Sequence, residues 1–370
     1  MRAVMVKEFQ ELRRDHRTLA LLIVMPLLLL VIFGYAANFT VEHLTVALFG
    51  SESSQVEALI DSNDELGDRV EVVSVDEDGA YDDAEQLLVD NGADVAIVAD
   101  GGSEVQVLID GSNLFAAQSA QVLFAQVQAQ LAQQPSAPTV DVQVLFNPDL
   151  KTSWVMVPAI IGLILTFIGT IITSIGLVRE REAGTLEQLA VMPLRPSSVV
   201  LGKISPYFVL ASFDMALITT IALLLFNVPF VGDATIFIVG AAEFLFVTLG
   251  IGVLISSVSQ TTGQAIQLAI MVQLPQILLS GMIFPLDAMA VGVRWIGYLL
   301  PLTYFTMISQ GVMIRGASWD SLWLPLVVLA VMAVVVFGLA VTRLGRSISP
   351  VKPRPQPELA RARHTAEVEP

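Results

Sequence analysis

The chain of 370 residues is 54% apolar and 15% charged, has no cysteine and carries a net charge of −16. With a mean hydropathy of +0.71, this composition excludes an ordinary soluble globular protein and indicates a polytopic membrane protein. The acidic balance argues against a nucleic-acid-binding surface, and the lack of cysteine excludes a disulfide framework.

The N-terminal segment, residues 1–17, precedes the first long apolar run and is mixed in charge. Val4, Phe9 and Leu12 can share one face of a helix, which predicts a cytoplasmic amphipathic helix lying in the membrane interface. Residues 18–37 follow as the first predicted span. The alternative is a cleaved signal peptide, because two alanines close this run.

Residues 38–150 alternate between strand and helix patterns, which predicts an α/β domain inserted between the first two spans. Strands are expected at 44–49, 70–75, 93–99, 105–109 and 140–145, and helices at 53–62, 80–91 and 113–133. The segment is rich in acidic residues and has a single basic one, Arg69. Acidic pairs such as Asp76 with Asp78 lack the loop spacing of calcium sites, which favours a solvated acidic surface over a cation site.

Further apolar runs are long enough to cross a bilayer as helices. They cover residues 154–178, 204–226, 235–257, 264–284 and 321–342. Residues 285–316 are apolar but interrupted by glycines and prolines, which favours short extracytoplasmic interfacial or re-entrant helices, with a seventh span as the alternative. The predicted fold is a polytopic α-helical membrane protein with six transmembrane helices and an inserted extracytoplasmic α/β domain. Residues 343–370 are expected to form a disordered cytoplasmic tail.

Basic residues gather in the N-terminal segment, in the loop 179–203 and in the tail, which all lie on one side if there are six spans. The positive-inside rule makes that side cytoplasmic and places residues 38–150 outside. We therefore expect a multi-pass protein of the plasma (inner) membrane with both termini in the cytoplasm. A long domain translocates largely regardless of its charge, so the acidity of residues 38–150 agrees with this orientation without establishing it.

The loop 179–203 is the one charged segment between two long apolar runs. Its polar and interrupting positions include Glu180, Glu182, Gly184, Thr185 and Glu187. Pro193 is expected to end a short helix here, and Pro196 to prevent its restart. Such a helix cannot span a bilayer, so it would lie against the membrane and offer side chains to a partner. An ordinary solvated loop is the alternative.

The sequence offers no catalytic motif. The pair Gly202–Lys203 lacks both the first glycine and the Ser or Thr of a phosphate-binding loop. The three histidines are scattered along the chain, so neither a zinc cluster nor a Ser-His-Asp arrangement is expected. We therefore expect no catalytic residue, no metal site and no cofactor bound by this chain, and no enzymatic activity of its own.

Polar side chains within the apolar runs mark a candidate substrate path. Asp214 and Glu243 lie inside the third and fourth predicted spans, where an acidic residue costs about 2.5–3.5 kcal/mol to insert at the helix centre. Such residues usually face the bundle interior or a water-filled cavity. Gln264 and Gln267 of the fifth span add polar groups to this path. Hydrogen bonding between the helices is the alternative.

Three glycines, Gly162, Gly169 and Gly176, recur at a constant interval along the second predicted span. Small residues on one face let another helix approach closely. This repeat therefore predicts a helix–helix contact rather than a binding site.

Two blocks of the sequence resemble the ABC-2-type transporter permeases. The first has their Glu-rich stretch, Gly-Thr-x-Glu core, proline and Gly-Lys pair at Glu180, Glu182, Gly184, Thr185, Glu187, Pro193, Gly202 and Lys203. The second agrees at Gly281, Phe284, Pro285, Met289, Trp295, Pro301, Leu302, Thr303, Tyr304, Arg315 and Gly316. It departs from the family at residues 288–291, where a second proline after the methionine is common.

This resemblance implies the permease subunit of an ATP-driven exporter for a drug-like, antibiotic, lipid or other amphipathic substrate. It implies that Glu180, Glu182, Gly184, Thr185 and Glu187 contact a separate cytoplasmic ABC ATPase. That ATPase would bind the ATP and magnesium, and a second permease copy or a sibling permease would complete the transporter. The alternative from another class is a non-transporting membrane scaffold or receptor whose outer domain recruits a ligand or partner.

Overall fold

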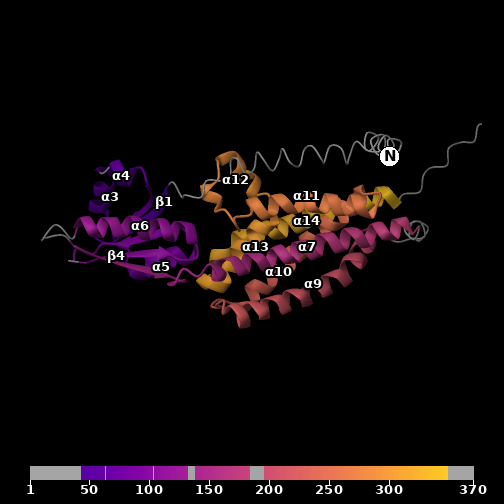
Figure 1. Ribbon diagram of the computed structural model, residues 1–370, viewed down its shortest axis with the longest axis horizontal. Coiled ribbons are helices and arrows are strands. Elements are labelled where there is room, and N and C mark those ends of the chain that lie inside the picture. Colours follow the sequence, from indigo (N-terminus) through magenta and orange to yellow (C-terminus); the bar gives the residue numbers. More distant parts are fainter. Residues whose placement is uncertain (1–42, 63, 103, 132–137, 184–195, 349–370) are drawn as a thin grey trace, which may run out of the picture.

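The computed structural model describes residues 43–62, 64–102, 104–131, 138–183 and 196–348 (Figure 1). The described part of the chain is an α/β domain followed by a bundle of long helices. The predicted N-terminal helix and first span lie outside the described residues, as do the middle of the charged loop and most of the predicted tail.

A five-stranded mixed sheet forms the centre of the α/β domain, in the order β2-β1-β3-β4-β5. β1 is parallel to β2 and β3, whereas β4 is antiparallel to β3 and parallel to β5. The strands are β1 Leu44–Phe49, β2 Val70–Asp76, β3 Val95–Val98, β4 Glu104–Asp110 and β5 Thr139–Leu145. The helices are α3 Ser53–Ser62, α4 Asp64–Gly67, α5 Tyr81–Val89 and α6 Leu114–Leu131. Every strand and helix predicted here is confirmed, and α4 is an addition.

Helices cover both faces of the sheet because its strands carry apolar residues on both sides. In β1, Val46 and Leu48 pack in the core beneath α3 and α6, whereas Ala47 and Phe49 pack in the core beside α5. Successive side chains of a strand point to opposite faces, so a continuous apolar strand requires cover on each. Figure 1 shows α6 and α5 on opposite sides of β4.

Five long helices make up most of the bundle. They are α7 Thr152–Glu182, α9 Pro196–Phe226, α10 Ala234–Val258, α11 Thr262–Leu279 and α14 Trp319–Ile348. By length and apolar composition, each can cross a membrane. The α/β domain lies at one end of this bundle (Figure 1).

Short helices connect α11 to α14. They lie in residues 285–316, where the sequence predicted short helices rather than one continuous helix. They are η1 Leu286–Ala288, α12 Val291–Gly297, α13 Pro301–Gln310 and the π-helix η2 Gly311–Arg315. α12 and the helix that follows it are bent by 80°, and counting this bent pair as one span raises the described candidates from five to six. Gly316 ends η2 with φ of 68°, a backbone conformation that glycine adopts without strain.

One local expectation is wrong. Pro196 was expected to prevent a helix, but α9 begins at this residue. Proline is well suited to the first position of a helix, because its fixed φ is helical and its missing N–H would have no partner there. Glu180 and Glu182 correspondingly belong to the last turn of α7 rather than to a separate helix.

α7 lies at the centre of the bundle, and the glycine repeat is the reason that other helices approach it closely. A methyl group added at Gly162 would collide with Phe305 of α13, and one at Gly176 with Tyr207 of α9. At Gly169 the added carbon would lie 3.0 Å from Thr248 Oγ1 of α10. The predicted helix–helix contact is therefore confirmed, and the three glycines serve three different neighbours.

Asn147 fixes the start of α7 to the α/β domain. Its side chain is fully buried, and its Oδ1 accepts a hydrogen bond from Lys151 N at 2.9 Å. Its Nδ2 donates to Gly111 O at 3.3 Å and to Lys151 O at 3.2 Å. One amide thus holds the first turn of α7 against the turn between β4 and α6.

Candidate functional site

The helix ends farthest from the α/β domain carry a polar cluster, here called the far-end cluster. Its members are Glu180, Arg181, Glu182, Lys203, Ser259 and Thr262. Lys203 of α9 forms an ion pair with Glu180, and the guanidinium of Arg181 donates to the carbonyl of Ser259. The last turn of α7 is therefore bonded to α9 and to the end of α10.

Glu182 adds α11 to these contacts. Its carboxylate accepts hydrogen bonds from Thr262 N at 2.9 Å and from Thr262 Oγ1 at 3.0 Å. Thr262 is the first residue of α11, where free backbone N–H groups and the helix dipole favour a negative charge. Glu182 nevertheless remains exposed, so its carboxylate can accept further hydrogen bonds from outside the chain.

The length of α7 places this cluster beyond the apolar part of the helix. α7 has 31 residues, which corresponds to about 46 Å, whereas the hydrocarbon core of a bilayer is about 30 Å thick. α7 is therefore long enough for its charged last turn to extend beyond the hydrocarbon. Gly184, Thr185 and Glu187, the other predicted coupling residues, lie outside the described residues.

The structure distributes the predicted path residues over three helices. Asp214 on α9 and Glu243 on α10 are half-buried, Gln264 on α11 is half-buried, and Gln267 is exposed. Among the described residues, no hydrogen bond joins any two of these four side chains. Glu243 Oε2 is shut off from solvent and has no hydrogen-bond partner in the described part of the chain.

Two other glutamines of α11 are more deeply buried. Gln273 and Gln276 are 2% and 1% exposed. Within the described ranges, Gln273 Nε2 and both polar atoms of the Gln276 amide lack a hydrogen-bond partner. A buried polar group without a partner costs about 1–3 kcal/mol, so a further hydrogen-bonding group beside these amides would be stabilising.

The junction between the α/β domain and the bundle is organised by Arg315. Its side chain is 7% exposed, and it lies 3.8 Å from the carboxylate of Asp110, which is 2% exposed. Arg315 Nη1 donates to Asn91 Oδ1 at 2.6 Å and to Ser112 Oγ at 3.2 Å. A hydrogen bond between Ser321 Oγ and Asp90 lies beside this network.

Burial and neighbouring groups act in opposite directions on the pKa of the Asp110 carboxyl. Burial raises the pKa of the Asp110 carboxyl, while the charge of Arg315 and the hydrogen bonds from Ser112 lower it. Ser112 N donates to Asp110 Oδ1 at 2.8 Å. Arg315 therefore supplies the main charge that compensates a carboxylate which burial disfavours.

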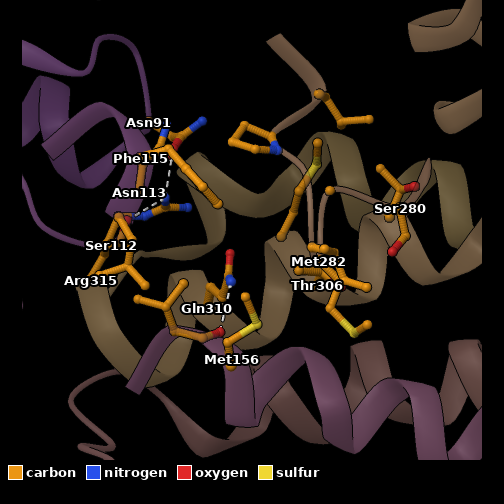
Figure 2. A pocket seen from close by; sticks show the side chains of 18 residues that line it. Asn91, Ser112, Asn113, Phe115, Met156, Ser280, Met282, Thr306, Gln310 and Arg315 are labelled. Atoms are coloured by element: carbon orange, nitrogen blue, oxygen red, sulfur yellow. Dashed lines mark hydrogen bonds between the residues drawn. The ribbon is translucent and has the colours of Figure 1, made fainter. Parts of the chain in front are cut away.

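A cleft of about 130 Å³ opens beside this network (Figure 2). Its walls come from the α/β domain, the start of α7, the segment after α11, and α13. Figure 2 shows Asn91, Ser112, Asn113 and Arg315 gathered on the side of the α/β domain. The sequence had marked Arg315 only as a family-like position.

The sequence could not reveal this site because its parts are far apart along the chain. Arg315 and Asn91 are separated by 224 positions. Arg315 itself was a detectable signal, since a cation at the end of an apolar segment usually has a buried partner. The partner could not be chosen from sequence, because residues 38–150 contain many carboxylates.

Long apolar helices with polar groups gathered at both ends define a membrane-embedded helical protein with an attached α/β domain. A comparison with known families identifies which family of membrane proteins this is. A family model for ABC-2 family transporter proteins matches residues 16–342. The chain therefore belongs to the ABC-2 transporter family, and the resemblance seen in its two sequence blocks is confirmed.

Relatives of known description agree with this assignment. The probable multidrug ABC transporter permease YbhR of Escherichia coli strain K12 is 30% identical over 343 residues, covering 88% of this chain and 93% of YbhR. The probable multidrug ABC transporter permease YbhS of the same strain is 30% identical over 345 residues, covering 85% and 89%. ABC transporter G family member 20 of Dictyostelium discoideum is 29% identical over 216 residues, covering 58% of this chain and 30% of that protein.

Replacing Arg315 should loosen the junction. Removing one partner of a buried ion pair costs about 3–5 kcal/mol, because the other charge is left uncompensated. We expect Arg315→Gln to lower the thermal unfolding temperature of the purified protein and to speed limited proteolysis of the α/β domain. The control is Asp149→Asn in the exposed pair with Lys151, which should change stability by at most about 1 kcal/mol. Equal stability of both variants would contradict a structural role for the Arg315 network.

Proposed function

We propose that this chain is the permease subunit of an ATP-driven exporter that moves a drug-like, antibiotic, lipid or other amphipathic substrate out of the cell. The observation that carries the proposal is the far-end cluster. Through it, the last turn of α7 is bonded to α9, to the end of α10 and to the start of α11. A force applied at this point would reach four helices at once.

That force would come from a separate cytoplasmic ABC ATPase. The phosphate-binding loop is missing at the one position where the sequence approaches it, so nucleotide chemistry belongs to the partner. Glu180, Glu182, Gly184, Thr185 and Glu187 are the proposed contacts with the ATPase. A second copy of this chain, or a sibling permease, would form the other half of the transporter.

The proposed orientation has six spans, both termini in the cytoplasm and the α/β domain outside. The clustering of basic residues in the N-terminal segment, the charged loop and the tail supports it. The far-end cluster then lies on the cytoplasmic side, because it occupies the end of the bundle opposite the α/β domain.

The orientation can be tested directly, since the natural chain has no cysteine. Single cysteines at Ser62, Ser198 and Ser349 should react with a membrane-impermeant maleimide on intact cells only at position 62. After permeabilisation, all three should react. External labelling at position 349 would mean an additional span and would reverse the placement of the tail.

Reversing two charges at the far end should uncouple the transporter. Glu182→Arg combined with Glu187→Arg replaces attraction to basic groups of the ATPase by repulsion. Since exposed pairs are individually weak, we expect about tenfold weaker ATPase binding, more pronounced at low salt. ATP-driven export should fall while the permease still reaches the membrane. Pull-down of the ATPase and export assays in the same cells provide the two measurements.

A matched control separates this effect from the contact that Glu182 makes within the chain. Thr262→Val removes the hydroxyl that donates to Glu182 but leaves both carboxylates in place. ATPase binding should then remain at the wild-type level. If the double reversal also binds and exports normally, the charged end of α7 is not the coupling site.

Asp214, Glu243, Gln264 and Gln267 are proposed to contribute to the substrate path, with Glu243 as the strongest member because its Oε2 is buried without a partner among the described residues. Glu243→Leu should lower export of an uncharged amphipathic dye, measured per permease in the membrane. Glu243→Gln keeps a hydrogen-bonding group of the same size and should export nearly normally. If Glu243→Leu exports as well as wild type, the carboxyl serves helix packing or nothing at all.

A further inference from the structure

The cleft at the junction is lined by polar and apolar side chains from both the α/β domain and the bundle. The α/β domain and the end of η2 contribute Asn91, Ser112, Asn113 and Arg315, beside the apolar Leu114 and Phe115. The bundle contributes the methionines Met156, Met282 and Met307, together with the hydroxyls of Ser280 and Thr306. Figure 2 shows Met156, Met282, Ser280 and Thr306 on the bundle side. A wall of this kind fits a molecule with one polar end and one apolar end.

Two hydroxyl groups at the wall lack partners. Ser280 follows the last residue of α11 and is 1% exposed, and Thr306 on α13 is 4% exposed. Both residues line the cleft, and in the described part of the chain both side-chain oxygens lack a hydrogen-bond partner. Since buried hydroxyls are normally hydrogen-bonded, a group bound in the cleft would supply what the protein itself does not.

The charges around the cleft select an uncharged ligand. None of the described residues that line it carries a carboxylate, so a bound cation would find no counter-charge. The lining cation, Arg315, is paired with Asp110 and bonded to Asn91 and Ser112 through Nη1, while its buried Nε has no hydrogen-bond partner among the described residues. An anion would have to compete with Asp110 and would also meet the acidic α/β domain.

The volume of the cleft and the flexibility of its methionine side chains indicate what the apolar part of a ligand could be. An enclosed volume of about 150 Å³ holds a benzene molecule, and the cleft has about 130 Å³. Three methionines provide unbranched, polarisable side chains that adapt to different shapes. The cleft as a whole is therefore close to the size of one aromatic ring or a short aliphatic chain.

We propose that this cleft is a binding site, one in each permease chain, for uncharged amphipathic molecules that carry a hydrogen-bonding oxygen beside a ring or short chain. The hydroxyls of Ser280 and Thr306 bond the oxygen, and the methionines surround the apolar part. The proposal deepens the exporter function by assigning a substrate class to one site. It depends on that function only for the claim that the bound molecule is cargo.

The test uses the cysteine-free chain. Phe115 is half-buried and lines the cleft, so Phe115→Cys reports access to it, while Ser62→Cys reports a remote exposed site. The purified permease in nanodiscs is labelled with a maleimide in the presence of benzyl alcohol, benzylammonium or benzoate. These probes share one ring and differ in the charge of the polar group. Benzyl alcohol should slow labelling at position 115 but not at position 62, and the two ions should have little effect.

Hydroxyl variants identify the groups that bind. Adding Ser280→Ala and Thr306→Val to Phe115→Cys should weaken protection by benzyl alcohol about tenfold, the effect of losing two modest hydrogen bonds. Thr173→Val is the matched control, since Thr173 on α7 also carries a buried hydroxyl without a described partner and does not line the cleft. It should leave protection unchanged.

Three outcomes would overturn the proposal. Equal protection by all three probes would mean that the cleft does not select by charge. Protection that survives loss of both hydroxyls would mean that they do not bind the ligand, and absence of protection would mean that the cleft holds only water. Because the assay needs no ATPase, selective binding without ATP-driven transport would retain the site and reject the exporter function instead.

Discussion

The structure depends on one uninterrupted helix that touches almost every other part of the bundle. α7 packs against α9, α10, α11 and α13, and its glycines occupy the positions where α9, α10 and α13 approach closely. A membrane helix satisfies its own backbone hydrogen bonds, so close packing rather than polar pairing determines which helices meet. Asn147 holds one end of α7, and Glu182 and Arg181 hold the other. The α/β domain and the far-end cluster are therefore connected through a single rigid element.

The two ends of this element differ in how firmly they are held. At the junction, Arg315 and Asp110 are almost fully buried, and breaking such a pair is costly. At the far end, Glu180 is 43% exposed and Glu182 is exposed, so these pairs exchange with water and with other partners at small cost. A protein that changes conformation when a partner acts on it would rearrange first where its contacts are weakest. That end is the one whose charges remain available to a partner.

The parts of the fold that could be predicted are those determined by local patterns. Short apolar runs predicted all five strands of the α/β domain, and long apolar runs predicted the helices α7, α9, α10, α11 and α14. The failures came from contacts that local patterns do not encode. Pro196 was misread because proline both breaks a helix interior and begins a helix, and only the packing of α9 decides between these roles. Arg315 was noticed but not paired, because its partners belong to a domain more than two hundred positions away.

The candidate sites show the same difference between residues that local sequence patterns indicate and contacts that only the folded chain reveals. Glu180 and Glu182 were identified from their charge between apolar runs, but their bonds to Lys203 and Thr262 required the folded chain. Asp214, Glu243, Gln264 and Gln267 were chosen because polar groups are rare in apolar helices, yet the structure spreads them over three helices. The buried, unpartnered amides of α11 in the described part of the chain belong instead to Gln273 and Gln276.

α11 joins the far-end cluster to the cleft. Its first residue, Thr262, is bonded to Glu182 of the far-end cluster, and Ser280, directly after its last turn, lines the cleft. Gln273, Gln276 and Ser280 recur at helical spacing, so they share one side of α11 and form a row of buried polar groups leading to the cleft. α11 thus connects the end of α7, where we propose a partner contact, to the cleft, where we propose a ligand.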